Sequence, residues 1–307
     1  MAEYNFRTVD GSGSASSDLQ LGRYGIWSGE LRSADAGAAA GAAAELEELG
    51  FGALWLPGRG AGGFERVDAL LAATQRVPVA TGIVSIWQHD AAEMAAGYTR
   101  LEEIHPGRFL LGIGVSHSPM VDRDEPGRYR RPLERLSRFL DELDAAPVPV
   151  PVGRRVLASL GPRSLALAAT RSAGTHPYLV PVAHTRWARG LIGEGRLLAP
   201  EQGVVLDPDP VRGRLLAREF LTRYLQLPNY VNNLRSLGYT AEDIQDGGSD
   251  RLVDEVMVVG DAGRALERAQ AHLDAGADHV CFQVIQEHGA GLPLEAWRAL
   301  ARAAAAA

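Results

Sequence analysis

Short apolar runs alternate with helical stretches along almost the whole chain, and this alternation restricts the fold more than any other feature of the sequence. The run at residues 109–113 is apolar throughout, which is typical of a strand buried on both faces of a parallel sheet. Eight strands, each followed by a helical stretch, favour the α/β class and, within it, a closed (β/α)8 TIM barrel. The strands are expected at residues 24–27, 53–56, 79–86, 109–113, 156–158, 176–180, 197–206 and 279–284.

One barrel accounts for most of the 307 residues. Residues 1–19 are polar, rich in glycine and serine and without period, and they are predicted to form a disordered tail. Residues 20–307 are predicted to form a single TIM-barrel domain, because barrels of this length often remain undivided. Residues 229–248 have a polar, partly helical character that predicts an insertion after the seventh strand.

An open, doubly wound sheet is the alternative fold. Such sheets, when they bind dinucleotides, carry Gly-x-Gly-x-x-Gly after the first strand, and this chain has no such motif there. The nearest run, Gly112-Ile113-Gly114, lies inside the fourth predicted strand and lacks the third glycine. The barrel is therefore the preferred fold.

Composition and charge argue against several classes of function. The chain has 31 basic and 38 acidic residues, a net charge of −7, and its basic residues are all arginines spread along the sequence. An acidic chain without a basic run is a poor candidate for binding nucleic acid. Neither a secretion signal nor an apolar run of membrane-spanning length is found, so a cytoplasmic protein without membrane partners is expected.

Metal, disulfide and hydrolase chemistry are weakly indicated. The single cysteine, Cys281, excludes an intrachain disulfide and is predicted to be a buried thiol rather than a nucleophile. The eight histidines lack the spacing of a metal site, and Gly-x-Ser-x-Gly is absent. No metal is expected.

In a β-α barrel the active site lies at the carboxyl ends of the strands. His117, in a loop after the fourth strand, is the leading candidate to contact a ligand. Trp27 and Trp87 suit either of two roles, plugging the barrel mouth or contacting a planar ring. His89 precedes Asp90, a predicted helix N-cap, so a capping-region histidine and a catalytic one are equally expected. The further candidates are Ser28, Arg59, Gln88, His176, Tyr178, Glu201, Gln202, Glu287 and His288.

Two of these candidates have a preferred structural interpretation. Glu201 lies within an apolar strand, where a carboxylate needs a partner or water, and an ion pair with an arginine of the barrel is preferred. His288 lies near the variable end of the chain and is expected on the surface.

Two helix starts predict an anion site. Gly161-Pro162-Arg163-Ser164 opens a helix after the fifth strand, and residues 181–185 open one after the sixth. Free amides at helix N-termini, the helix dipole and the Arg163 guanidinium together suit a phosphate group. Their place on neighbouring strands indicates a cofactor that carries phosphate.

Several longer segments resemble the motifs of a known protein family. The most specific is Pro-Gly-Arg-Phe-x-Leu-Gly-Ile-Gly at residues 106–114, and further ones lie at residues 50–57, 80–85, 160–165, 173–178 and 273–280. Over residues 21–286 the chain resembles the luciferase-like monooxygenase superfamily, and within it the deazaflavin (coenzyme F420)-dependent oxidoreductases. Thr-His-Pro-Tyr at 175–178 and Leu-Pro-Asn-Tyr-Val-Asn-Asn at 227–233 resemble one branch of probable F420-dependent enzymes.

The resemblance implies a luciferase-like barrel with an insertion after the seventh strand, a homodimer, and F420 as cofactor, with FMN as the alternative. It also implies a non-proline cis peptide bond, Gly82-Ile83, behind the central ring of the cofactor. The phosphate group would lie on the two helix starts. The residues expected to bind the cofactor are Trp27, Gly82, Ile83, Ser85, Leu160, Gly161, Pro162, Arg163, Val182 and Thr185.

The chain departs from the related sugar-phosphate dehydrogenases at their acid and base positions. They carry an Asp-His pair where this chain has Gly58-Arg59, and a glutamate where this chain has His117. Sugar-phosphate oxidation is therefore not expected. His117, Arg59 and His89 are the predicted catalytic residues, with His117 as proton donor or acceptor and Arg59 stabilising negative charge.

The predicted function is hydride transfer between C5 of the deazaflavin and a small organic substrate. An FMN-dependent two-component monooxygenase on the same fold is the chemical alternative. A non-catalytic barrel that binds a flavin or a partner protein is the alternative from another class. Binding of F420, of FMN or of neither distinguishes the three.

Overall fold

The computed structural model describes residues 19–58, 63–123 and 125–306. Nearly all of the predicted tail, residues 1–18, lies outside the described residues, as does Arg59. No helix in the described ranges is both long and apolar enough to cross a bilayer.

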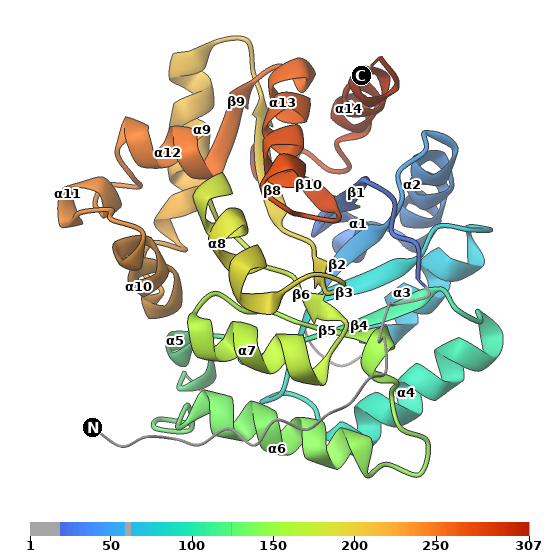
Figure 1. Ribbon diagram of the computed structural model, residues 1–307. Helices are drawn as coiled ribbons and strands as arrows, with labels where there is room; N and C mark the ends of the chain where they lie inside the picture. The colour runs from blue at the N-terminus through green and yellow to red at the C-terminus, as the bar shows by residue number, and fades with distance from the viewer. Residues whose placement is uncertain (1–18, 59–62, 124, 307) are drawn as a thin grey trace, which may run out of the picture.

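The described strands, ten in number, form one sheet in which every pairing is parallel (Figure 1). Their order across the sheet is β7-β6-β5-β4-β3-β2-β1-β10-β8-β9. The sheet curls, and helices lie around its outer side (Figure 1). The strands are β1 Tyr24–Trp27, β2 Leu54–Gly58, β3 Val79–Ser85, β4 Phe109–Gly114, β5 Arg155–Leu157, β6 Gly174–Thr175, β7 Leu197–Leu198, β8 Glu201–Leu206, β9 Met257–Gly260 and β10 Val280–Val284.

Helix boundaries follow the local chemistry of the sequence. The predicted N-cap is confirmed, because the Asp90 carboxylate accepts a hydrogen bond from the Glu93 amide at 2.7 Å. Gly50 and Gly276 have φ values of 87° and 102°, the left-handed conformation that ends a helix before a strand. The helices are α1 Glu30–Ser33, α2 Ala36–Glu48, α3 Gly63–Ala72, α4 Ala91–Ile104, α5 Ser118–Val121, α6 Pro132–Asp144, α7 Pro162–Arg171, α8 Val182–Ile192, α9 Pro210–Thr222, α10 Pro228–Ser236, α11 Ala241–Ile244, α12 Asp250–Val256, α13 Ala262–Asp274 and α14 Leu294–Ala305, with a 3₁₀ turn at Val152–Arg154.

The chain between β7 and β8 is hydrogen-bonded on both sides. Only Ala199 and Pro200 separate the two strands, and the Glu201 amide donates to the Pro177 carbonyl on one side. On the other side, the Cys281 amide donates to the Pro200 carbonyl. The structure confirms the predicted α/β class and a curled, wholly parallel sheet, whose two outermost described strands, β7 and β9, do not pair with each other.

Two layers of apolar side chains hold the sheet. The larger lies between the sheet and the helices and includes Phe109 and Phe282. The smaller lies inside the curl, where Trp55, Leu110 and Cys281 are fully buried. The Cys281 thiol is buried as predicted.

Three predictions about strands are wrong or incomplete. Residues 176–180 are not a strand, because Pro177 has no amide to donate and Leu179 has a φ of 57°. Pro200 interrupts the predicted seventh strand. The periodicity also fails to predict α12 and β9, which follow the helical insertion formed by α10 and α11.

A buried ion pair at the base of β5 gives a test of the fold. The Arg155 side chain is fully buried, and its Nη1 lies 2.6 Å from Asp144 Oδ1 at the end of α6. Burial opposes ionisation of Asp144, but hydrogen bonds from Arg155 and Arg171 hold the pKa of this carboxyl below its usual value. D144A should lower the free energy of unfolding by about 2–3 kcal/mol, because it leaves a buried charge without its partner.

Urea denaturation followed by circular dichroism measures this loss. E142A, at an exposed position on the same helix, is the control and should change stability by less than about 0.5 kcal/mol. Equal losses in the two variants would contradict a stabilising role for the Arg155 pair.

Candidate functional site

The middle of β3 carries one residue more than the neighbouring strand. Residues 81–83 lie between the pairs Ala80↔Leu110 and Val84↔Ile113, opposite only residues 111–112 of β4. The Thr81 hydroxyl donates to the Gly112 carbonyl at 3.0 Å and accepts from the Gly112 amide at 2.8 Å, which replaces the interrupted ladder. Such a bulge redirects side chains and is common beside active sites.

The bulge makes part of a buried strand accessible. Gly82 and Ile83 are partly exposed, whereas the other residues of β3 are buried. The peptide bond between them is cis and is the only non-proline cis bond in the described residues, as predicted. Gly82 and Ile83 therefore offer a backbone surface at the inner face of the sheet.

The glycines of the 106–114 motif make room for this bulge. A Cβ on Gly112 would overlap with the Thr81 carbonyl oxygen, and a Cβ on Gly114 would lie 2.7 Å from Ile83 Cδ1. Gly112 and Gly114 thus have a packing role beside β3.

A tryptophan and a histidine support the bulge from inside. A Cβ on Gly82 would lie 2.5 Å from Trp27 Nε1 and 3.0 Å from His176 Nε2. His176 Nδ1 donates to the Ala199 carbonyl at 2.7 Å, so Nε2 carries the lone pair, and the ring stacks on Trp55 at 4.2 Å. Burial lowers the pKa of His176 to about 4, so this ring is neutral at physiological pH.

Aromatic rings form a wall beside this support. The Tyr178 ring lies 5.6 Å from Trp27 and 6.1 Å from Tyr230, and Tyr230 lies 5.6 Å from Tyr224. The His117 ring packs on Tyr230 at 5.0 Å. The structure therefore brings two predicted site residues, Trp27 and His117, to the two ends of one aromatic cluster.

The predicted insertion supplies part of this wall. Asn229 Nδ2, on α10, donates to the Ser116 carbonyl at 3.2 Å and to the Tyr129 hydroxyl at 3.3 Å. These contacts hold α10 against the loop that carries His117. Sequence reasoning did not assign a site role to Tyr224 or Tyr230, although Tyr230 lies within the distinctive segment at residues 227–233.

Glu201 lies on the inner face of the sheet without the predicted arginine partner. Its Oε2 accepts a hydrogen bond from the Leu179 amide at 3.3 Å, and its Oε1 has no partner among the described residues. The side chain is 2% exposed, and burial raises the pKa of this carboxyl to about 8. The preferred ion-pair interpretation is wrong, and Glu201 is a neutral acid at physiological pH.

The two predicted helix starts are joined. His184 Nε2 lies 2.9 Å from the Leu160 carbonyl, which links the N-terminus of α8 to the loop before α7. Gly161 and Val182 are partly exposed, and Pro162 and Arg163 are exposed. The Thr185 hydroxyl is turned inward to His272 Nδ1 at 2.7 Å, so only the backbone of Thr185 is left for the predicted contact.

Other predicted residues lie apart from the aromatic cluster. His89 Nδ1 lies 3.2 Å from Glu93 Oε2, a pairing at the start of α4. The Ser85 hydroxyl accepts from the Trp87 amide at 3.3 Å, and Trp87 Nε1 donates to the Val115 carbonyl at 2.7 Å.

The remaining candidates at strand ends have no visible link to this cluster. Gln202 points away from the inner face of the sheet, toward His272, whose Nε2 lies 3.1 Å from its Oε1. Ser28 donates to the Glu30 carboxylate at 2.8 Å. Gln88, Glu287 and His288 lie at or near the surface.

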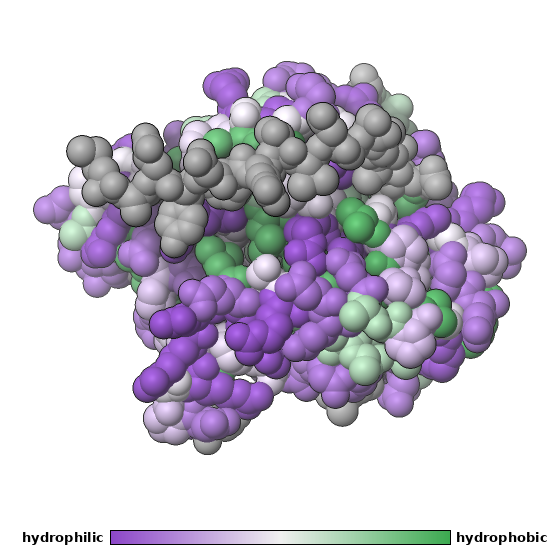
Figure 2. All heavy atoms as spheres, turned by 60° about the horizontal axis from the view of Figure 1, so that its bottom comes forward, coloured by the Kyte–Doolittle hydropathy of each residue, from purple (hydrophilic) through white to green (hydrophobic). Residues whose placement is uncertain are grey.

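Figure 2 shows one face of the molecule with a central hollow. Hydrophobic residues are seen in this hollow, and hydrophilic residues lie around it. Within the described ranges, no group of three or more His, Cys, Asp or Glu side chains is placed to hold a metal ion.

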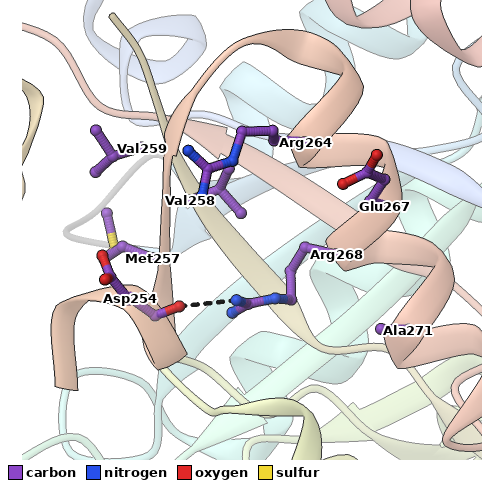
Figure 3. A pocket seen from close by; sticks show the side chains of 8 residues that line it. All are labelled: Asp254, Met257, Val258, Val259, Arg264, Glu267, Arg268 and Ala271. Atoms are coloured by element: carbon purple, nitrogen blue, oxygen red, sulfur yellow. Dashed lines mark hydrogen bonds between the residues drawn. The ribbon is translucent and has the colours of Figure 1, made fainter. Parts of the chain in front are cut away.

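A separate cleft of about 220 Å³ lies between α12, β9 and α13 (Figure 3). Arg268 crosses it and donates to the carbonyls of Asp254 and Glu255 at 2.7 and 2.6 Å. Burial lowers the pKa of Arg268. Because this guanidinium satisfies the end of α12, the cleft has a structural explanation.

Comparison with known proteins supports the resemblance. The family model described as luciferase-like monooxygenase matches residues 22–147, the part of the chain that contains β1 to β4 and the bulge. This match confirms the resemblance predicted from the sequence. No protein with curated annotation matches the chain.

Solved structures share the fold at low sequence identity. An F420-dependent secondary alcohol dehydrogenase in complex with an F420-acetone adduct is 14% identical, with a TM-score of 0.69 over 92% of this chain and 97% of that one. F420-dependent tetrahydromethanopterin reductase from Methanopyrus kandleri is 14% identical, with a TM-score of 0.63 over 91% and 97%. The oxygenating constituent of 3,6-diketocamphane monooxygenase from Pseudomonas putida, in complex with FMN, is 13% identical, with a TM-score of 0.64 over 92% and 97%.

The raised pKa of Glu201 makes stability depend on pH. The unfolded chain ionises this carboxyl near pH 4.5, whereas the folded protein keeps it protonated up to about pH 8. Between these values folding takes up a proton, so this residue's contribution to the free energy of unfolding falls as the pH rises. E201Q removes that dependence, and relative to the wild type it should gain up to about 1.4 kcal/mol for each pH unit in this window.

Urea denaturation of both proteins at several pH values between 4.5 and 8 measures the difference. E48Q, at an exposed position on α2, is the control and should follow the wild type. A constant difference between E201Q and the wild type across the window would show that Glu201 is ionised in the folded protein.

Proposed function

We propose that this protein, whose residues 22–147 match the luciferase-like monooxygenase family, is an F420-dependent oxidoreductase that transfers a hydride to or from a small organic substrate. An FMN-dependent monooxygenase on the same fold is the second candidate. Both cofactors occur among the structural neighbours, and their low identity to this chain supports the fold alone.

The observation that carries the proposal is the bulge in β3. Gly82 and Ile83 are accessible, lack bulky polar groups, and are supported from inside by Trp27. A flat, rigid backbone surface beside an aromatic wall fits a planar tricyclic ring. When bound, a deazaflavin supplies or accepts a hydride at C5.

The other end of the cofactor carries phosphate, and the starts of α7 and α8 fit it. The amides near Gly161 and Val182, together with Leu160, Pro162 and Thr185, would surround the phosphate, and Arg163 would neutralise its charge. The His184 contact with Leu160 would keep the two helix starts at a fixed separation.

Proton handling is assigned to residues near the aromatic wall. His117 would donate or accept a proton at the substrate, because its ring is partly exposed beside Tyr230. Arg59, outside the described residues, would hold negative charge. His89 is the weaker assignment, since its ring is paired with Glu93. Ser85 would support the bulge through its contact with the Trp87 amide.

Complete closure of the barrel, a single domain over residues 20–307, a homodimer and a cytoplasmic location remain predictions. A non-catalytic barrel is the third candidate, because the acid and base positions of related dehydrogenases are changed.

Titration of the apoprotein with F420 and with FMN, followed by the absorbance of each ring, distinguishes the three candidate functions. Tight binding of F420 alone supports the proposal, binding of FMN alone supports the monooxygenase, and binding of neither contradicts both.

Arg163 provides a specific test of the phosphate end. R163A should weaken binding of the phosphate-bearing cofactor by about tenfold, because a charge-assisted hydrogen bond contributes about 1.5 kcal/mol or more. The loss should shrink at high salt, since Arg163 is exposed and its charge is screened. Isothermal titration at two salt concentrations measures both effects.

R138A is the matched control, because Arg138 is an exposed arginine on α6, a helix that forms neither of the two helix starts. It should leave cofactor affinity unchanged. Equal weakening by R163A and R138A would mean that general surface charge, and not the helix starts, determines affinity.

A further inference from the structure

Tyr178 and Gln283, a hydrogen-bonded pair at the aromatic wall, can each form a further hydrogen bond. The Tyr178 hydroxyl lies 2.7 Å from Gln283 Oε1 and donates to it, and it lies 2.9 Å from the Tyr224 hydroxyl. The Gln283 amide nitrogen donates to no group in the described part of the chain, and it is not among the fully buried unsatisfied atoms. Because the single Tyr178 proton is donated to Gln283, the Tyr224 hydroxyl donates to the Tyr178 oxygen, and one lone pair of that oxygen remains. The pair therefore offers a donor, Gln283 Nε2, next to an acceptor, the Tyr178 oxygen.

This pair lies close to the bulge of β3. Tyr178 and His176 are two residues apart, and both side chains meet the support of the bulge: His176 Nε2 faces Gly82, and the Tyr178 ring packs on Trp27. Gln283 comes from the opposite side, on β10, where it pairs with Gly203 of β8. The Tyr178 ring thus reaches the support of the bulge through Trp27, and Gln283 joins Tyr178 from β10.

We propose that Tyr178 and Gln283 form the subsite that binds the oxygen of a neutral substrate, in both its carbonyl and its hydroxyl form. Gln283 Nε2 donates to the oxygen in either form, and the Tyr178 oxygen accepts the proton of a hydroxyl. A carbonyl and its alcohol differ by one hydride and one proton, so one subsite that accommodates both suits the reaction proposed above, on which this inference rests.

The charges nearby favour a neutral ligand over an anion. Tyr178 and Gln283 are uncharged, and the acid that interacts with Tyr178 is Glu201. Burial, then Tyr224 and Glu201, raise the pKa of Tyr178 well above its usual value, so the phenol stays protonated. The apolar rings of Trp27 and Tyr230 complete the surroundings. A carboxylate would lose its hydration here without gaining a cation from the described side chains that contact this pair.

Three probes of one shape test the subsite: cyclohexanone, cyclohexanol and methylenecyclohexane, which has no oxygen. Saturation-transfer NMR measures their dissociation constants on the apoprotein and on protein loaded with F420 or FMN. The two oxygen-bearing probes should bind at least about fivefold more tightly than methylenecyclohexane, as one hydrogen bond predicts.

Variants of Gln283 and Tyr178 distinguish the contribution of the amide donor from that of the phenolic acceptor. Q283M, which keeps the side-chain length, should weaken cyclohexanone and cyclohexanol alike by about fivefold. Y178F, which keeps the ring on Trp27, should weaken cyclohexanol more than cyclohexanone, because only the alcohol donates to the phenolic oxygen. Y98F is the control, since the Tyr98 hydroxyl meets Glu102 on α4, and it should change neither.

Thermal melts confirm that each variant is folded. Equal binding of methylenecyclohexane and cyclohexanone, or unchanged binding in Q283M, would overturn the subsite. Failure of the wild type to bind F420 and FMN would contradict the proposed function alone, because the probe pattern on the apoprotein is read independently. Cofactor binding without the probe pattern would contradict the subsite alone.

Discussion

The hydrogen bonds between the Thr81 hydroxyl and the Gly112 backbone are the interaction on which the candidate site depends. They let β3 carry an additional residue without leaving buried backbone groups unsatisfied on β4. As a consequence, Gly82 and Ile83 are partly exposed in the middle of a strand whose other residues are buried. Small residues on β4 are required by this geometry, since a side chain at Gly112 would overlap with the Thr81 carbonyl oxygen.

The insertion contributes to the aromatic wall beside this accessible strand. Asn229 attaches α10 to the Ser116 carbonyl, and the attachment positions Tyr230 between His117 and Tyr178. The aromatic wall is therefore built from segments after β4, β6 and β8, which are distant in sequence. Figure 1 shows α10 and α11 at one side of the molecule, away from the helices that cover the back of the sheet.

The sequence predicts those features that depend on local pattern or on a specific motif. The apolar run of β4, the Asp90 cap and the cis bond before Ile83 are of this kind, and all three are confirmed. The sequence does not predict features that depend on which side chains meet in space. Nothing local in the sequence says that Glu201 has no arginine partner, or that Tyr178 meets Gln283 across the sheet. The strand β6 is short because of Pro177 and the positive φ of Leu179. Pro177 stands in the sequence, whereas the φ of Leu179 is visible only in three dimensions.

The polar groups around the bulge share one electrostatic property, which is neutrality at physiological pH. Burial keeps His176 deprotonated and Glu201 protonated, and it keeps the Tyr178 phenol intact. A site built in this way would suit an uncharged reactant, and the proposed ionic contacts of the cofactor would lie at the helix starts near Arg163. Charge at one end and neutral hydrogen-bonding groups at the other would orient a cofactor that is itself anionic at its tail and nearly neutral at its ring. In the proposed function, the separation of these two environments would direct the ring toward Gly82 without a charged acid or base beside it.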